Sequence, residues 1–246
     1  MMIDEKLRWY GFWLLDSLHG GKEKAYYNKI KESYQKGTSI AETQEKLGKL
    51  IAHAVKTTDF YKDFPADVPL EMLPVMNKDT YRSRYDAFLS KAYKDDPDNR
   101  IMSTSGSTGT PFQVVQDHEK ILWNQVGGVF LGALGGWYIG MKDAFVRMWV
   151  GDHGKKSRLE KLKENLVMVN WCNIDDKAIG EMLEQFRRKK VKCIIGYASA
   201  IADISRYIDQ YQVDLSGFCI KSIIPISESM PVTVRRRLEE QFQCSC

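Results

Sequence analysis

The sequence has few of the residues on which metal sites and disulfide frameworks depend. Its four histidines, at positions 19, 53, 118 and 153, include no pair at the H-x-x-x-H spacing of a helix-borne metal site. Its five cysteines are odd in number and form no C-x-x-C pair, which speaks against disulfides and zinc. The start of the chain has no signal-peptide profile. We therefore expect a cytoplasmic protein without a metal site, in which Cys193 and Cys219 are buried, reduced thiols.

Charge of one sign is not in excess. The 36 Lys and Arg residues against 32 Asp and Glu residues leave a net charge of +4 over 246 residues. A nucleic-acid-binding surface would need clustered basic residues with aromatic residues between them. The basic runs 187–190 and 235–237 are short and fall near the end of, or within, expected helices, where exposed cations are ordinary. We expect no nucleic acid among the partners.

One mostly apolar stretch, 121–141, nearly reaches the length that spans a membrane. Its glycines at 128, 132, 136 and 140 follow the small-xxx-small pattern of packed membrane helices. However, Asn124 and Gln125 interrupt the stretch, and a Gly135–Gly136 pair weakens a single continuous helix. We expect a buried helix whose glycine face lies against a sheet, and no stable membrane insertion.

The sequence changes character near residue 95. Residues 1–95 have mostly helical spacing, with a proline-interrupted irregular stretch at 60–74 and Asn77 as the N-cap of a short helix ending at residue 88. A turn signal at 95–99 separates this helical N-terminal part from residues 96–246, where short apolar runs alternate with helical patterns.

This alternation predicts an α/β fold with a largely parallel sheet flanked by helices, preceded by a helical segment. The expected strands are 113–116, 144–150, 166–170, 192–195 and 219–226. The expected helices are 118–136, 157–164, 176–189, 198–210 and 231–241, with Asp175 as the N-cap of the third. Ligands of such folds collect at the carboxyl ends of the strands.

A loop rich in hydrogen-bond donors lies between the extended runs 100–102 and 112–116. It reads Ser103, Thr104, Ser105, Gly106, Ser107, Thr108, Gly109 and Thr110, followed by Pro111. Glycines let the backbone N–H groups approach a ligand and the hydroxyls add donors, which suits a polyphosphate; an ordinary polar turn is the alternative. The spacing matches neither the Walker A motif nor G-x-G-x-x-G. Its position predicts a strand-to-strand phosphate flap.

The loop closely resembles the phosphate-binding signature of adenylate-forming enzymes, the superfamily of acyl-CoA synthetases. Further segments resemble the phenylacetate–CoA ligase-like branch, including its capsule-biosynthesis-type relatives. They are 47–62, 73–79, Ile195–Ser199 (Ile-Gly-Tyr-Ala-Ser) and Ile223–Ser229 (Ile-Ile-Pro-Ile-Ser-Glu-Ser). Two residues depart from the pattern: Ala198 stands where proline is usual, and Phe112 where many members have lysine.

The resemblance implies that ATP activates a small-molecule carboxylate as an acyl-adenylate, which is then transferred to coenzyme A. It implies that the loop from Ser103 to Thr110 holds the β- and γ-phosphates and that Ser227 and Glu228 lie by the nucleotide. Tyr197 and Ser199 would line the acyl pocket. Alternatively, Tyr197–Ser199 cap one helix and Ser227–Ser229 begin another. The resemblance names no catalytic residue in this chain.

In this family the Glu that supports Mg²⁺ and a C-terminal domain with a catalytic Lys follow the region that this chain resembles. We therefore expect an N-terminal fragment, incapable of complete turnover alone, with the metal and coenzyme A sites elsewhere. A homodimer or a separate C-terminal half are the expected protein partners. A non-catalytic nucleotide-binding remnant and a protein of surface-polysaccharide biosynthesis stay open as alternatives, and no residue identifies the acyl substrate.

Overall fold

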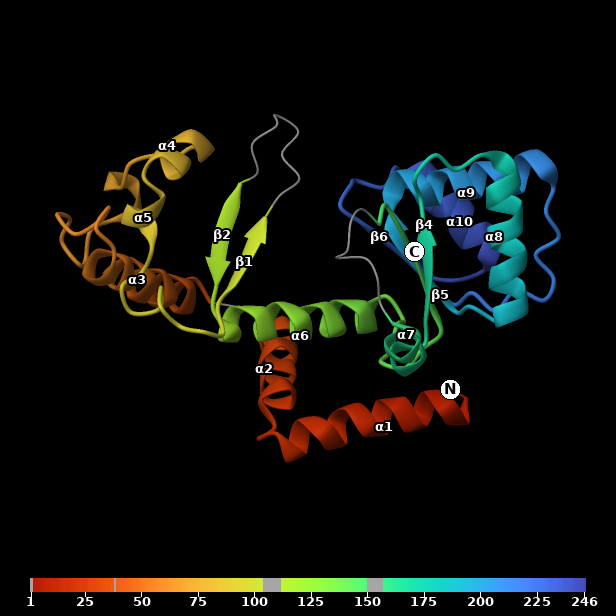
Figure 1. The fold of residues 1–246 in the computed structure, drawn as a ribbon, viewed down its shortest axis with the longest axis horizontal. Coiled ribbons are helices and arrows are strands. Elements are labelled where there is room, and N and C mark those ends of the chain that lie inside the picture. Colours follow the sequence, from red (N-terminus) through yellow and green to blue (C-terminus); the bar gives the residue numbers. More distant parts are fainter. Residues whose placement is uncertain (1, 38, 104–111, 150–156) are drawn as a thin grey trace. The chain divides into compact units, whose positions relative to one another are not determined.

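The computed structural model describes residues 2–37, 39–103, 112–149 and 157–246 (Figure 1). Two compact units make up the chain, one of Met1–Lys24 with Gly128–Cys246 and the other of Ala25–Gly127. These units differ from the sequence parts 1–95 and 96–246. The difference arises because the first helix is attached to the sheet by buried polar contacts, although its own sequence is helical like the segments that follow it.

The unit formed by residues 1–24 and 128–246 is built on a parallel sheet (Figure 1). Its strands lie in the order β4-β3-β5-β6, and every neighbouring pair is parallel. The strands are β3 (Asp143–Arg147), β4 (Leu166–Asn170), β5 (Cys193–Tyr197) and β6 (Ser222–Ile226). The helices are α7 (Arg158–Glu164), α8 (Asp176–Lys189), α9 (Ala198–Tyr211) and α10 (Val232–Phe242). The expected parallel sheet flanked by helices is confirmed.

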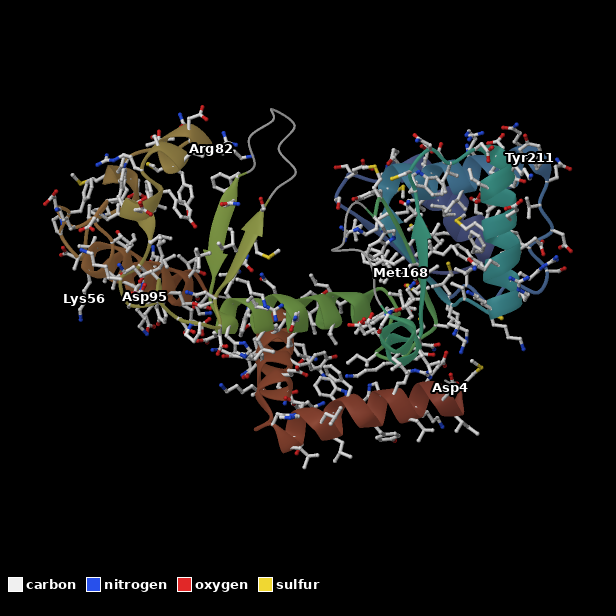
Figure 2. The ribbon with its side chains drawn as sticks, viewed as in Figure 1. Asp4, Lys56, Arg82, Asp95, Met168 and Tyr211 are labelled. Atoms are coloured by element: carbon white, nitrogen blue, oxygen red, sulfur yellow. The ribbon has the colours of Figure 1, made fainter. Side chains whose placement is uncertain are left out.

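The core lies between one face of this sheet and α8, α9 and α10. Because strand side chains alternate, Val146, Ile194 and Ile223 point to this face, where the apolar sides of the helices bury them. Each fully buried aliphatic side chain stabilises the fold by about 1.5–3 kcal/mol. On the opposite face the side chains of Met168 (labelled in Figure 2), Phe145, Ile195 and Ile224 are only half-buried, whereas Asp143, Cys193 and Ser222 at the start of the strands are buried.

Local chemistry sets the ends of these elements. Asp175 caps α8 as predicted, its carboxylate accepting a hydrogen bond from the main-chain N–H of Ala178 at 2.8 Å. Strand β3 ends at Arg147, earlier than residue 150, since the side chain of Asn170 takes the N–H of Trp149 at 3.1 Å. Strand β6 begins at Ser222, so Cys219 lies outside it and is only half-buried, whereas Cys193 is buried as expected.

The glycine-rich stretch does not form one packed helix face, and that prediction was wrong. Helix α6 (His118–Leu134) ends before Gly136 and Gly140, which adopt φ values of 85° and 88° in turns. A Cβ placed on Gly128 would meet no atom within 4 Å. Gly132, which also lies in α6, does have a close neighbour: a Cβ there would lie 2.9 Å from the ring of Trp137, a residue that follows the helix.

No helix within the described parts of the chain is both long enough and apolar enough to cross a bilayer.

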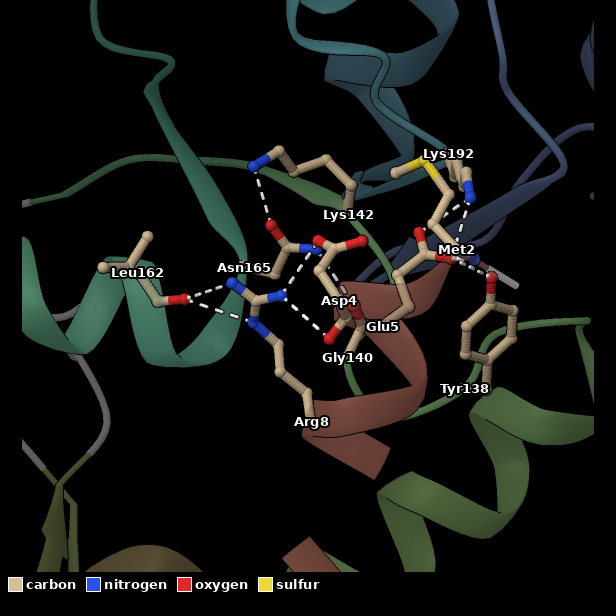
Figure 3. Close-up of polar contacts among 10 residues, drawn as sticks. All are labelled: Met2, Asp4, Glu5, Arg8, Tyr138, Gly140, Lys142, Leu162, Asn165 and Lys192. Atoms are coloured by element: carbon tan, nitrogen blue, oxygen red, sulfur yellow. Dashed lines mark hydrogen bonds and ion pairs between the residues drawn. The ribbon is translucent and has the colours of Figure 1, made fainter. Parts of the chain in front are cut away.

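Helix α1 (Ile3–Leu18) is attached to the amino-terminal edge of the sheet through Glu5 (Figure 3). The Glu5 side chain is fully buried and pairs with Lys192 Nζ, which lies 2.7 Å from Oε1 and immediately before β5. Tyr138 Oη and the main-chain N–H of Met2 donate to Oε2 at 2.9 and 2.7 Å. Burial alone would raise the pKa of Glu5, but these donors together hold its pKa below the ordinary value.

A second set of contacts at the same edge joins α1 to α7, and joins the end of α7 to the segment before β3 (Figure 3). The Arg8 guanidinium donates to the carbonyl oxygen of Leu162 at 3.0 and 3.3 Å. The buried amide of Asn165 donates to the carbonyl of Gly140 at 2.9 Å and accepts from Lys142 Nζ at 2.7 Å. Helix α1 is therefore held at the edge where the strands begin.

The unit formed by residues 25–127 is mainly helical, as expected for most of its length. Its helices are α2 (Lys22–Lys36), α3 (Ile40–Thr57), the 3₁₀ turn η1 (Leu70–Met72), α4 (Lys78–Ser83) and α5 (Tyr85–Phe88). Asn77 caps α4 as predicted, its side chain accepting from the N–H of Thr80 at 2.8 Å. The helix expected to reach residue 88 is broken at Arg84, whose ψ of 28° is not helical.

Two antiparallel strands complete this unit: β1 (Arg100–Ser103) and β2 (Gln113–Gln116). Phe112, next to β2, lies 5.0 Å from the ring of Tyr81, which in turn lies 5.0 Å from Phe88. Phe60 stacks on Phe88 at 4.1 Å. This aromatic cluster ties the strand pair to the short helices and the 60–74 segment.

Candidate functional site

The candidate site is the carboxyl edge of the parallel sheet, where the last residues of all the strands lie. Strand β5 ends at Tyr197 and leads directly into α9, while β6 ends at Ile226 and leads into the turn of Ser227 and Glu228. Tyr197 and Ile226 are partners in the β5–β6 ladder. Ligands of open parallel sheets bind at this kind of edge.

The structure brings two of the predicted segments into direct contact. The main-chain N–H of Ser199 donates to Glu228 Oε2 at 2.8 Å. Both the N–H and the hydroxyl of Ser199 bond to this carboxylate and hold the pKa of Glu228 below its ordinary value. Glu228 is therefore an anion at neutral pH, fixed at the amino end of α9.

The need for this contact follows from the sequence at the start of α9. The first N–H groups of a helix have no partner within the helix. Tyr197 occupies the N-cap position and makes no side-chain capping bond, so Glu228 supplies an acceptor from the neighbouring turn. A carboxylate in this place also interacts favourably with the helix dipole. This gives Glu228 a structural role, whatever further role it has toward a ligand.

The backbone is constrained in both segments. Ser227 has a φ of 68°, in the left-handed region that non-glycine residues rarely adopt. A side chain on Gly196 would place its Cβ 2.6 Å from the carbonyl oxygen of Val146, so only glycine fits in that position of β5. The Gly-Tyr-Ala-Ser segment thus owes its glycine to the close approach of β3.

The phosphate-loop prediction rests on residues of which only one is described. Ser103 is the last residue of β1, is exposed, and pairs with Gln113 of β2. The chain between them therefore links two antiparallel strands, as predicted. Residues 104–111, which carry Thr104, Ser105, Gly106, Ser107, Thr108, Gly109 and Thr110, lie outside the described residues. Ser103 belongs to the 25–127 unit, whereas Tyr197, Ser199, Ser227 and Glu228 belong to the sheet unit.

A cation at the carboxyl edge was not singled out from the sequence. Arg147 is the last residue of β3, and its guanidinium lies 4.8 Å from the Trp149 ring centre and 5.6 Å from that of Phe145. Its Nε is buried without a hydrogen-bond partner. The available signal was an arginine inside an otherwise apolar strand, Ala-Phe-Val-Arg-Met-Trp-Val, where a charge needs a reason.

Within the described ranges, no three His, Cys, Asp or Glu side chains gather into a set that could hold a metal ion.

Comparison by sequence yields nothing, since no protein-family model and no curated protein matches the chain. Comparison by structure finds solved structures of 2-hydroxyisobutyryl-CoA ligase. The complex with 2-HIB-AMP and CoA in the thioesterification state has a TM-score of 0.54 and 16% identity, covering 84% of this chain and 48% of that one. An open conformation with 2-HIB-AMP and CoA has a TM-score of 0.53 and 14% identity, covering 83% and 51%.

The chain thus spans about half the length of the solved structures that it matches. At this level of identity the likeness shows a common fold.

Proposed function

We propose that this chain belongs to an enzyme that activates a carboxylate with ATP as an acyl-adenylate and passes the acyl group to coenzyme A. The observation that carries the proposal is the pairing of Tyr197–Ser199 with Glu228 at the carboxyl edge of the sheet. These are the two segments that the resemblance to adenylate-forming enzymes assigns to the acyl and nucleotide pockets. The fold shared with 2-hydroxyisobutyryl-CoA ligase supports the same reaction class.

The proposed chemistry begins with displacement at phosphorus. A carboxylate oxygen of the substrate forms a bond to the α-phosphorus of ATP, and the bond from that phosphorus to pyrophosphate breaks. In the second step a thiol sulfur attacks the acyl carbon, AMP leaves, and the thiol proton passes to solvent. Phosphoryl chemistry of this kind depends mainly on positioning and on stabilising charge.

The chain's own residues would serve these steps by holding groups in place. The hydroxyl and N–H groups of Ser103 to Thr110 would donate to the β- and γ-phosphates and orient the leaving pyrophosphate. Tyr197, half-buried beside the start of α9, would border the acyl group. Glu228 and Ser227 would lie by the nucleotide, with Glu228 held rigid by Ser199.

More narrowly, we propose a cytoplasmic enzyme of the phenylacetate–CoA ligase-like branch. The proposal is based on the resemblance of segments 47–62, 73–79, 195–199 and 223–229 to that branch. The magnesium and coenzyme A sites of such an enzyme would involve groups other than those named above.

The phosphate loop is tested by calorimetric titration of the chain with ATP and with AMP. Replacing Gly109 by valine removes the freedom that the backbone needs around phosphates, so we expect Gly109→Val to weaken ATP binding roughly tenfold or more. AMP lacks the β- and γ-phosphates, so its affinity should change little. Gly48→Ala is the matched control, because Gly48 lies on α3 with open space around its Cβ position. Equal loss for ATP and AMP, or unchanged ATP affinity, would contradict the assignment.

A further inference from the structure

The guanidinium of Arg147 has no protein acceptor in the described structure. Its Nε is buried without a hydrogen-bond partner, and no carboxylate of the described residues forms an ion pair with it. Other arginines of the same unit are paired, as in Arg187 with Glu184 at 2.6 Å and Arg206 with Asp176 at 3.4 Å. An arginine carries five N–H donors, and buried donors in folded proteins are almost always satisfied. The unpaired Nε of Arg147 therefore points to an acceptor that the described residues do not provide.

Two aromatic rings set the position of this guanidinium. The rings of Phe145 and Trp149 lie edge to face, with centres 5.5 Å apart, and Arg147 lies over both. Trp149 is fixed in turn by two hydrogen bonds to β4. Its main-chain N–H donates to Asn170 Oδ1 at 3.1 Å, and its indole N–H donates to the carbonyl of Val169 at 3.0 Å. The cation is thus held in place on a rigid support, as a preorganised binding group needs to be.

The sheet register places Arg147 beside the predicted acyl pocket. Val146 of β3 pairs with Gly196 of β5, so the following residues, Arg147 and Tyr197, come at the same level of adjacent strands. In-register residues of parallel strands point to the same face. Below them on that face lie the half-buried side chains of Phe145, Met168 and Ile195. A cation therefore borders an apolar sheet face at the ligand-binding edge.

We propose that Arg147 binds the carboxylate of the acyl substrate, and that this substrate is a carboxylic acid with an apolar body. The inference rests on the carboxylate activation proposed above. The guanidinium fork matches the two oxygens of a carboxylate, and the apolar sheet face suits the remainder of the acid. Arg147 would hold the acid beside Tyr197 while its carboxylate meets the nucleotide.

The test compares acids with their neutral amides. Phenylacetate, benzoate and 2-hydroxyisobutyrate, each with its amide, are titrated into the chain by calorimetry. We expect at least one acid to bind more tightly than its amide. Arg147→Gln should lower the affinity for that acid roughly 10- to 100-fold, the range for hydrogen bonds to charged groups, and leave the affinity for the amide unchanged. Arg147→Lys, which keeps the charge but loses the fork, should fall between the two.

Controls separate binding from folding and from general charge. Arg235→Gln removes a cation that is paired with Glu239 on the exposed side of α10, and it should leave acid binding unchanged. Circular dichroism and a thermal melt check each variant; if Arg147→Gln fails to fold, the comparison rests on Arg147→Lys.

The outcomes also distinguish this inference from the proposed function. Binding of ATP by the wild-type chain without any preference for acids, or an acid preference that survives Arg147→Gln, would overturn the role of Arg147 alone. If Arg147→Gln lowers the affinity for AMP as much as the affinity for the acid, Arg147 binds the nucleotide phosphate, and its proposed role toward the acid is overturned. Absence of ATP binding would instead count against the proposed function.

Discussion

Asp143 shows how one buried side chain makes the sheet unit sensitive to pH. It begins β3 with 6% of its surface exposed, and its Oδ2 accepts a hydrogen bond from the Trp137 indole at 2.7 Å. Its Oδ1 is buried without a partner. Burial raises the pKa of Asp143 to about 8, although the Trp137 bond acts in the opposite direction. The carboxyl group therefore retains its proton in the folded protein near neutral pH.

This pKa predicts that the fold weakens as pH rises. The folded pKa lies above the ordinary value of 3.8, so the folded chain binds more protons than the unfolded chain between about pH 4 and pH 8. The free energy of unfolding should fall across this window and level off above it. Asp143→Asn removes the titration and should flatten the profile between pH 5.5 and 8.5, where wild type loses on the order of 3 kcal/mol.

Urea unfolding of both proteins at three pH values measures the effect. Glu5, another buried carboxyl group of the sheet unit, has a lowered pKa, so its contribution is lost only in more acidic solution and does not interfere. Parallel profiles for wild type and Asp143→Asn would show that Asp143 is ionised in the folded protein.

At the scale of single elements, α9 depends on a cap that comes from another turn. Because Tyr197 makes no side-chain capping bond, Glu228→Ala leaves the N–H of Ser199 without its acceptor. We expect a loss of about 1 kcal/mol in the free energy of unfolding, similar to that of Asp175→Ala, which removes the ordinary N-cap of α8.

Urea unfolding of the two variants makes the comparison, with Ser199→Ala as a control that keeps the main-chain donor. If Glu228→Ala is as stable as wild type, the hydrogen bond seen in the structure contributes nothing, and Glu228 would be free for a ligand.

The elements themselves were largely predictable. Alternating apolar runs and amphipathic periods identified β4 and α8 at their observed bounds, since both patterns follow from a core on one side of the chain. The glycine stretch at 121–141 misled the prediction because glycine serves equally in helix contacts and in turns. Gly136 and Gly140 have positive φ values and lie in turns, not in a helix.

The candidate site was only partly predictable. The topology of a parallel sheet brings Tyr197–Ser199 and Glu228 to one edge, and both segments had been named through the family resemblance. Arg147 was missed because the sign of its role is a missing hydrogen-bond partner, which only the structure shows. Whether an arginine has an ion-pair partner depends on side chains from other strands, and the sequence of β3 alone does not contain that information.

At the scale of the whole molecule, the buried pair of Glu5 and Lys192 fastens the first helix to the sheet unit. Removing one partner of a buried ion pair strands the other charge, so Glu5→Ala should cost about 3 kcal/mol or more. Adding Lys192→Met removes the stranded charge and should restore much of the loss. Urea unfolding and limited proteolysis of residues 3–18 measure both. A double variant no more stable than Glu5→Ala would show that α1 is held mainly by other contacts.

The chain spans about half the length of the ligase structures that share its fold. The proposed binding of a carboxylate and a nucleotide rests, within the described structure, on the sheet edge with Arg147, Tyr197 and Glu228. Binding of nucleotide and acid by this chain can therefore be measured without complete turnover.

The most direct test of carboxylate adenylation is the affinity for a stable mimic of the acyl-adenylate. An acyl-sulfamoyl adenosine joins the acyl and adenosine parts that the two pockets are proposed to hold together. Calorimetry should show it binding at least 100-fold more tightly than AMP, as mimics of reaction intermediates do. Equal affinity for the mimic and AMP would indicate a non-catalytic nucleotide-binding protein. No binding of either by the folded chain would contradict the account as a whole.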